Sequence, residues 1–271
     1  MSHSSKSMND ATTSFTLTLD DVEVQAHPGE TLWQVAKRAG ETIPHLCFKD
    51  APGYRSDGNC RACMVEVEGE RVLAASCIRE AAPGMVVRSA GSSRVQAARK
   101  GVLELLLADQ PERADSPDRS SHLWQTADQL AIDASAVRQR IPAHSERNEP
   151  TVHHVELRSD SLAHARGHDA THSAMNVNLD ACITCGLCER ACREVQGNDV
   201  IGLAHRGAAS KVIFDFDDPM GDSTCVACGE CVQACPTGAL MPATLIDAEG
   251  RGDSATADRT VDSVCPYCGV G

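Results

Sequence analysis

The chain has 271 residues, a formal net charge of −13, 42% hydrophobic residues and 3% aromatic residues. The acidic charge argues against a nucleic-acid partner, which needs clustered Lys and Arg. The sequence shows no stretch of about 18 apolar residues for a membrane span, and no secretory or twin-arginine signal, so a cytoplasmic location is expected. In that reducing compartment, fourteen cysteines indicate metal binding rather than disulfides.

The N-terminal part predicts a short tail followed by a β-hairpin. Residues 1–14 are polar and are expected to be disordered. The segment FTLTLDDVEVQA, residues 15–26, alternates apolar and polar residues on both sides of Asp20 and Asp21. This pattern is typical of two antiparallel strands joined by a tight turn.

A short helix and a second hairpin are predicted to complete the first domain. In TLWQVAKRAG, Thr31 is a suitable N-cap and Gly40 a suitable C-cap for an amphipathic helix. The segment MVEVEGERVLAAS predicts a hairpin around Gly69, and residues 85–88 predict a further strand. We therefore expect a small mixed sheet with one helix across it in residues 15–92.

Residues 93–172 are predicted to form a helical spacer without metal ligands. The segment RVQAARKGVLELLL, residues 94–107, has helical periodicity. The stretch that follows is polar and interrupted by proline, with one further helix predicted for residues 123–138. It contains no cysteine.

The histidines of the chain carry less information than its cysteines. His164, His168 and His172 have a spacing that would place them on one helix face, where they could bind a metal. Gly167 weakens such a helix, so a solvated linker is the favoured interpretation. His45 and the pair at residues 153–154 are interpreted as surface or loop residues.

The strongest metal-binding signal lies in residues 173–246, where one cysteine spacing occurs twice. Each run reads Cys-x2-Cys-x2-Cys-x3-Cys, and the second is followed by Pro236. Three closely spaced thiolates can ligate one [4Fe–4S] cluster, while the fourth ligates the cluster of the other repeat. The predicted ligands are Cys182, Cys185, Cys188 and Cys235 for the first cluster, and Cys192, Cys225, Cys228 and Cys231 for the second.

A [2Fe–2S] site is predicted in the first domain from the spacing Cys47-x12-Cys60-x2-Cys63-x13-Cys77. Plant-type ferredoxins use three cysteines on one loop and a distant fourth. The small residues Gly53, Gly58 and Ala62 allow backbone N–H groups to approach the cluster. The alternative for both domains is structural zinc, but zinc sites normally join two separated CxxC pairs.

Residues 247–271 read as a polar linker that ends in CPYCGVG. Cys265 and Cys268 form a lone CxxC, which fits either a redox dithiol or half of a metal site. The other twelve cysteines are already assigned, so none remains to complete this site. The sequence has no glycine-rich nucleotide-binding motif and no arrangement typical of catalytic residues.

These motifs, in this order, resemble the N-terminal region of the α subunit of NAD-dependent molybdenum formate dehydrogenases. That family is related to the large iron–sulfur subunit of complex I and to the small diaphorase subunit of NAD-reducing hydrogenase. The resemblance is closest in HSAMNVNLDACITCGLCERACREVQGNDVIGLAHRG and FDFDDPMGDSTCVACGECVQACPTGAL. It implies an α+β chain with a β-grasp-like [2Fe–2S] ferredoxin domain, a helical spacer, a bacterial-type two-[4Fe–4S] ferredoxin domain and the start of a molybdopterin oxidoreductase domain.

The resemblance also implies partners and a third cluster. In the family CPYCGVG opens the molybdopterin domain, so Cys265 and Cys268 would be the first two ligands of a further [4Fe–4S] cluster. The molybdopterin itself would be held beyond Gly271. The implied partners are a flavin- and NAD-binding β subunit and a small [2Fe–2S] γ subunit. Many relatives carry another cluster site where this chain has Gln110 and Pro111. In this chain the segment directly after Pro111 contains no cysteine, so that cluster site is absent from it.

The predicted function is electron transfer from a molybdopterin site towards a flavin-bearing partner that reduces NAD. Alone, this chain is not expected to oxidise formate. The alternative is a stand-alone iron–sulfur subunit of an NAD-reducing hydrogenase or of a complex I-like oxidoreductase. A zinc-binding interaction scaffold is the less favoured third hypothesis.

Overall fold

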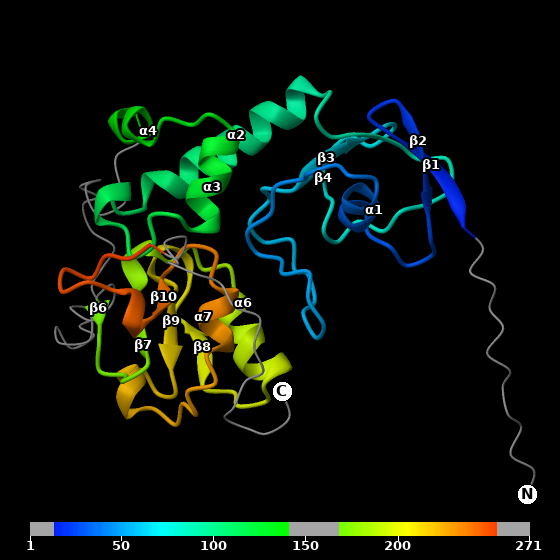
Figure 1. The fold of residues 1–271 in the computed structure, drawn as a ribbon. Helices are drawn as coiled ribbons and strands as arrows, with labels where there is room; N and C mark the ends of the chain where they lie inside the picture. Colours follow the sequence, from blue (N-terminus) through cyan, green and yellow to red (C-terminus); the bar gives the residue numbers. More distant parts are fainter. Residues whose placement is uncertain (1–13, 141–167, 254–271) are drawn as a thin grey trace, which may run out of the picture.

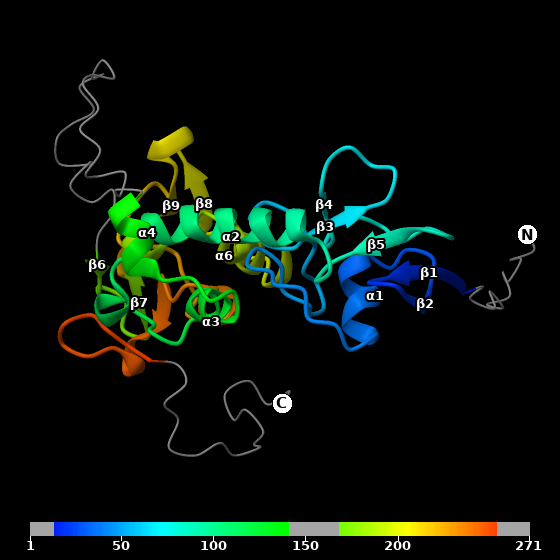
Figure 2. The same cartoon turned by 90° about the horizontal axis from the view of Figure 1, so that it is seen from above.

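A computed structural model describes residues 14–140 and 168–253. Cys265, Cys268 and His164 lie outside these described residues, as do residues 153–154. In Figure 1 a β domain, a group of helices and a second α/β domain follow one another along the chain. Helix α2 (Ser93–Ala108) runs from the first of these domains towards the second, as Figure 2 shows from above.

The β domain contains the predicted mixed sheet. Its strands are ordered β2-β1-β5-β3-β4, with β1 and β5 parallel and the other pairs antiparallel. Asp20 and Asp21 have φ of 47° and 68°, the left-handed pair that a two-residue hairpin turn requires. Both predicted hairpins are therefore confirmed. The strands are β1 (Phe15–Leu19), β2 (Val22–Ala26), β3 (Met64–Val67), β4 (Ala74–Ala75) and β5 (Val86–Arg88).

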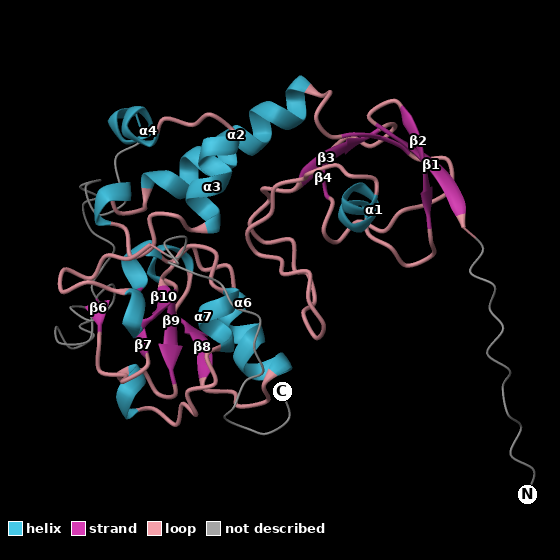
Figure 3. Ribbon diagram, in the orientation of Figure 1, coloured by secondary structure: helices cyan, strands magenta, loops and turns pink. Residues whose placement is uncertain are grey.

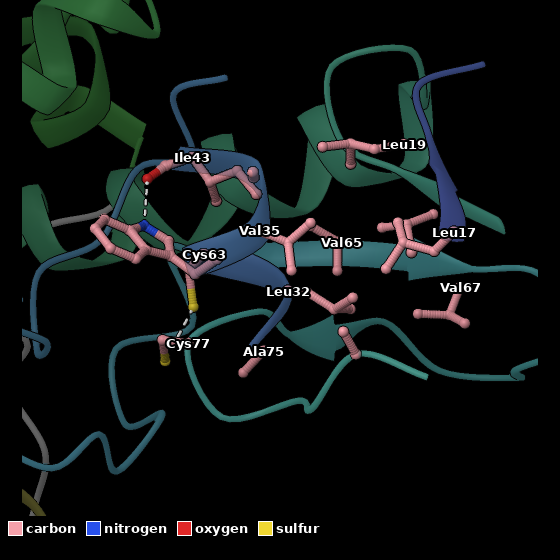
Figure 4. Close-up of a cluster of buried hydrophobic side chains, with 14 of the residues drawn as sticks. Leu17, Leu19, Leu32, Val35, Ile43, Cys63, Val65, Val67, Ala75 and Cys77 are labelled. Atoms are coloured by element: carbon pink, nitrogen blue, oxygen red, sulfur yellow. Dashed lines mark hydrogen bonds between the residues drawn. The ribbon is translucent and has the colours of Figure 1, made fainter. Parts of the chain in front are cut away.

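Helix α1 (Leu32–Arg38) packs against this sheet and closes its core. Thr31 and Gln34 form a capping box at its start, and the predicted N-cap is confirmed. The C-cap is Ala39, and Gly40 follows it with φ of 87°. Figure 4 shows apolar side chains of α1 facing those of the strands, with the Trp33 indole N–H donating to the Ile43 carbonyl at 3.0 Å.

The segment after α2 contains two helices where one was predicted for residues 123–138. Helix α3 (His122–Gln129) and helix α4 (Ala134–Arg140) are separated by a left-handed residue, Ala131, with φ of 50°. The Asp133 carboxylate then accepts N–H bonds from Ser135 and Ala136 at the start of α4. An Asp that caps new N–H groups begins a helix rather than continuing one. A short 3-10 helix, η1 (Arg113–Asp115), precedes α3.

The second α/β domain consists of two small sheets and short helices, coloured by type in Figure 3. One sheet has the order β10-β7-β6, and in the other β8 pairs with β9. The strands of the two sheets are β6 (His168–Asp169), β7 (Met175–Asn178), β8 (Ile201–Ala204), β9 (Lys211–Phe214) and β10 (Leu240–Pro242). The helical segments are η2 (Leu179–Ala181), α6 (Leu187–Arg190), the π-helical η3 (Ala191–Val195), η4 (Gly207–Ala209), η5 (Met220–Asp222), α7 (Glu230–Ala234) and η6 (Ala243–Leu245).

This domain begins earlier than the sequence predicted. His168 and Asp169 pair with Asn178 and Val177, so these two residues belong to its sheet and not to the spacer. His172 is buried, and its Nδ1 accepts N–H bonds from residues 174 and 175. His168 is exposed in β6 whereas His172 is buried, so the predicted solvated linker is wrong at His172.

Among the helices of residues 14–140 and 168–253, none is both long enough and apolar enough to cross a membrane.

Candidate iron–sulfur sites

Four cysteines meet at one end of the β domain. Cys47 lies in the loop after α1, and Cys60 and Cys63 lie in the segment that leads into β3. Cys77 follows β4, and its Sγ lies 3.4 Å from that of Cys63, as the dashed line in Figure 4 shows. The Cys60 N–H donates to the Cys47 Sγ at 3.3 Å. The structure therefore brings together the four residues that the spacing selected.

The crowding of these thiols alters their pKa values in opposite directions. The pKa of Cys47 is lowered to about 2, because the thiols of Cys60 and Cys77 donate to its sulfur. The pKa of Cys63 is lowered to about 6 by the thiol of Cys77. The pKa values of Cys60 and Cys77 are raised, mainly because they donate to Cys47. Cys47 and Cys63 therefore lose their protons more readily than an isolated thiol, and cysteine binds metal as the thiolate.

The two repeated runs of the second domain have the same backbone conformation. Thr184 and Ala227, each two residues after the first cysteine of its run, have φ of 50° and 58°. Two residues further on, Gly186 and Gly229 have φ of 74° and 76°. The N–H of Thr184 donates to Cys182 Sγ at 3.3 Å, and the N–H of Ala227 donates to Cys225 Sγ at 3.4 Å. Each loop therefore curls around its sulfurs with N–H groups directed at them.

The fourth cysteine of each run lies with the first three of the other run. Burial raises the pKa of Cys188, and the neighbouring thiols that raise it further are Cys185, Cys182, Cys235 and, more weakly, Cys231. Burial likewise raises the pKa of Cys231 to about 12, with contributions from Cys225, Cys228 and Cys192. The structure thus gathers the two crossed groups of sulfurs that the sequence predicted.

A small cavity of about 20 Å³ is lined by the cysteines of the first crossed group, Cys182, Cys185, Cys188 and Cys235. Its other lining is mainly apolar and includes Leu179, Val212 and Pro236. Soft thiolates around an apolar space suit an iron–sulfur cluster, because the cluster carries much of its charge on sulfur. The residues present therefore fit such a group.

The second crossed group is more open to solvent. Cys228 is exposed, and its neighbour Val226 is 62% exposed. Cys192 is buried, and its sulfur accepts the N–H of Val200 at 3.3 Å. The described residues therefore surround Cys192 and leave Cys228 accessible.

In the part of the chain that the structure describes, no group of three or more His, Cys, Asp or Glu side chains is arranged to hold a single metal ion. All twelve cysteines of that part are free thiols, so no disulfide competes for them.

The loop that carries Cys47 docks on the second domain through charged residues that the sequence did not single out. Glu230 accepts from Lys49 at 2.9 Å and from the Tyr54 hydroxyl at 2.7 Å, and these bonds lower its pKa. Arg55 pairs with Glu194 at 2.9 Å. Glu230 precedes Cys231 in sequence, but no local pattern could have identified its partners, which lie more than 170 residues away.

Three parts of the chain share one apolar core. Leu46 of the first domain, Leu103 of α2 and Leu123 of α3 are fully buried together, with Ile183 of the second domain packed against them. His45 and His122 meet beside this core, with ring centroids 5.1 Å apart. Burial lowers the pKa of both histidines. His45 lies in a loop, as one of the two predicted alternatives has it, and is partly buried there against Trp33 and His122.

Comparison with known proteins agrees with this geometry. Residues 12–92 match the 2Fe-2S iron-sulfur cluster binding domain, and residues 181–239 match the 4Fe-4S dicluster domain. The chain therefore contains both kinds of iron–sulfur domain, and the expected mixed α/β architecture is confirmed for them.

Several similar proteins belong to oxidoreductases of NAD or NADP. An NADH-quinone oxidoreductase subunit of Rhizobium meliloti is 31% identical over 94% of this chain and 27% of its own length. The NADP-reducing hydrogenase subunit HndD of Solidesulfovibrio fructosivorans is 33% identical over 83% of this chain and 36% of its own length. A Staphylococcus haemolyticus protein provisionally named formate dehydrogenase SH0748 is 23% identical over 94% of this chain. The chain thus spans about a quarter to a third of the length of these curated relatives.

One solved structure is similar over most of both chains. A chain of an NAD+-reducing [NiFe]-hydrogenase, in the H2-reduced state, aligns with a TM-score of 0.66 and 29% identity. The alignment covers 84% of this chain and 87% of that one. This chain is accordingly an iron–sulfur electron-transfer module similar to subunits of NADH-quinone oxidoreductase and of NAD-reducing hydrogenase.

Proposed function

We propose that the chain conducts electrons through one [2Fe–2S] and two [4Fe–4S] clusters. The observation that carries the proposal is the gathering of twelve cysteines into three adjacent groups of four. The thiol of Cys47 contributes to the raised pKa of Cys185, and the thiol of Cys231 to that of Cys188, so each group has a neighbouring group nearby. The proposed ligands are Cys47, Cys60, Cys63 and Cys77 for the [2Fe–2S] cluster, Cys182, Cys185, Cys188 and Cys235 for the first [4Fe–4S] cluster, and Cys192, Cys225, Cys228 and Cys231 for the second.

The protein residues have three tasks in this function. Bound clusters supply one-electron redox chemistry. The apolar core around Leu46, Leu103 and Leu123 excludes water and fixes the spacing of the sites. Backbone N–H groups of Cys60, Thr184 and Ala227 donate to cysteine sulfur, which favours the more negative, reduced state.

For the complete enzyme, we propose an NAD-dependent formate dehydrogenase. In that assembly electrons would come from a molybdopterin site outside this chain and pass to a flavin- and NAD-binding β subunit, with a small [2Fe–2S] γ subunit. The support is the CPYCGVG sequence with Cys265 and Cys268 as ligands of a third cluster, together with the provisionally named formate dehydrogenase relative. We propose a cytoplasmic location for this enzyme.

A second candidate is an iron–sulfur subunit of an NAD-reducing hydrogenase or a complex I-like enzyme. The specific observation in its favour is the hydrogenase chain, of which this chain covers 87%. The relatives at 31% and 33% identity point the same way. Formate and H2 separate the two candidates as reductants. Reduction of the clusters by formate, in the complex isolated with its natural partners, supports the first candidate, and reduction by H2 supports the second.

The electron-transfer proposal is tested by anaerobic isolation or reconstitution with iron and sulfide. About ten irons per chain, two plus four plus four, are expected, with a rhombic [2Fe–2S] EPR signal and two interacting [4Fe–4S] signals after dithionite reduction. A colourless protein that contains zinc and no acid-labile sulfide would overturn the proposal and support the zinc scaffold.

A further inference from the structure

A buried arginine lies between the [2Fe–2S] site and the first [4Fe–4S] site. Arg190 is the last residue of α6, two residues after Cys188 and two before Cys192. Its side chain is 3% exposed, whereas Arg193, one turn further on, is 49% exposed. Burying a guanidinium is costly unless charged or polar groups surround it, so the partners of Arg190 are informative.

The guanidinium of Arg190 joins the backbones of two proposed cluster ligands. Its Nη2 donates to the Cys47 carbonyl at 2.8 Å and lies 3.5 Å from the Cys185 carbonyl. Its Nη1 forms an ion pair with Asp57. A Cβ atom on Gly186 would lie 3.1 Å from Nη1, so a glycine here leaves room for the guanidinium beside the loop of Cys185.

The carbonyl contacts exceed what docking of the two domains requires. Lys49 with Glu230 and Arg55 with Glu194 already link the same loop to the second domain, and these pairs are more exposed. The Asp57 carboxylate that pairs with Arg190 also pairs with Arg55, so it balances the charge of Arg190 only in part. The Nε of Arg190 is buried without a hydrogen-bond partner among the described residues. An unpaired buried donor destabilises the fold, so the position that lets Arg190 reach the two carbonyls carries a cost in stability.

We propose that Arg190 is a positioning residue that couples the [2Fe–2S] site to the first [4Fe–4S] site. The inference rests on the proposed function. The planar guanidinium fixes the separation of the Cys47 and Cys185 backbones. The ammonium group of a lysine, on its flexible side chain, would not fix this separation. It also places a positive charge between the sites.

This charge acts on the reduction of each cluster. When a cluster takes up one electron from the dithionite or from its natural donor, no bond is made or broken and the cluster gains one negative charge. A buried cation nearby stabilises that charge more strongly than an exposed cation would, because the surroundings screen it less. Arg190 therefore favours the reduced state of both clusters, and the Asp57 carboxylate partly opposes it.

The experiment uses four variants of the cluster-loaded chain: Arg190→Met, Arg190→Lys, Asp57→Asn and, as the matched control, Arg193→Met. Iron and sulfide are counted, and the clusters are then titrated with dithionite and followed by EPR. Arg190→Met should make reduction of the two neighbouring clusters less favourable by about tenfold, which is about 59 mV for a one-electron couple. Asp57→Asn should shift the potentials in the opposite direction.

The conservative variant separates charge from geometry. Arg190→Lys should keep potentials near those of the parent but weaken the magnetic interaction between the [2Fe–2S] and [4Fe–4S] signals, because an ammonium cannot hold both carbonyls in one plane. Arg193→Met should change neither readout, since its exposed charge is screened. These results together would support the inference.

Other outcomes overturn it. Parent-like potentials and coupling in a fully loaded Arg190→Met chain would show that the arginine does not act on the clusters. Shifts in the same direction for Arg190→Met and Asp57→Asn would show a general loosening of the interface. If Arg190→Met does not hold clusters, Arg190→Lys and Asp57→Asn decide the question. If the parent chain itself shows no reducible clusters, the proposed function fails first.

Discussion

A Cβ atom on Gly238 would lie 2.3 Å from the Cβ of Asp118. Gly238 follows Cys235 by three residues, and Asp118 belongs to the segment that leads into α3. The Leu123 N–H also donates to the Pro236 carbonyl at 2.9 Å. The helical segment thus packs directly on the turn that carries the fourth cysteine of the first crossed group.

The first prediction concerns this contact. Gly238→Ala should lower the free energy of unfolding by about 2–4 kcal/mol, because a left-handed φ of 76° disfavours alanine and the new methyl group has no room. It should also reduce occupancy of the first [4Fe–4S] site, which needs Cys235. Thermal unfolding and iron content are the measurements.

Gly84→Ala is the matched control for that prediction. Gly84 has a similar φ of 71°, but nothing lies within 4 Å of its Cβ position. This variant should lose about 1–2 kcal/mol from backbone strain alone and keep its iron. Equal effects of the two substitutions would show that the contact with Asp118 is unimportant.

The second prediction tests the crossed ligand sets with paired substitutions. Cys182→Ala with Cys235→Ala removes two ligands of one proposed cluster, so about six of ten irons should remain. Cys182→Ala with Cys192→Ala removes one ligand from each, so both [4Fe–4S] clusters should be impaired and fewer irons should remain. Iron counting and EPR are the measurements. The reverse order of losses would indicate that each run holds its own cluster.

The third prediction concerns the start of α2. The Ser92 hydroxyl accepts the N–H of Val95 at 3.2 Å and donates to Glu66 at 2.6 Å. Ser92→Ala should lower the free energy of unfolding by about 1–2 kcal/mol through loss of the cap. Ser93→Ala, at the adjacent exposed position, should have little effect. Denaturant unfolding of both variants provides the comparison, and similar losses would contradict the assigned role of Ser92.

The fourth prediction concerns pH. Burial raises the pKa of Asp169, but bonds from the Thr171 hydroxyl and from the N–H groups of Met220 and Thr171 outweigh it, so the pKa is lowered overall. A lowered pKa stabilises the fold above the unfolded-state pKa of about 3.9, and this contribution is lost as the pH falls through the lower, folded-state pKa.

Asp169→Asn should therefore be less stable than the parent at neutral pH, and the difference should narrow as the pH falls below about 4. Melting temperatures of parent and variant in the same buffers measure this difference, since acid also displaces cluster iron from both. A difference that stays constant or widens at low pH would rule out the carboxylate as its source.

Most local features of the molecule could be predicted from sequence. The turn at Asp20 and Asp21 and the cap at Thr31 depend on residues within a few positions of one another, so their residue types specify them. The cysteine spacings likewise determined the candidate ligands, since three sulfurs of each run must lie on one short loop. The break at Ala131 was missed because an apolar, helix-like pattern continues across it.

What the sequence could not determine was how distant segments meet. Arg190 contacts Cys47 across 143 residues, and Lys49 contacts Glu230 across 181. No periodicity or spacing encodes such pairs, because they exist only after whole domains have docked and buried a common core. The sequence by itself determined which cysteines are the candidate cluster ligands. The tertiary structure decided that the three groups of cysteines lie side by side, with a buried arginine between two of them.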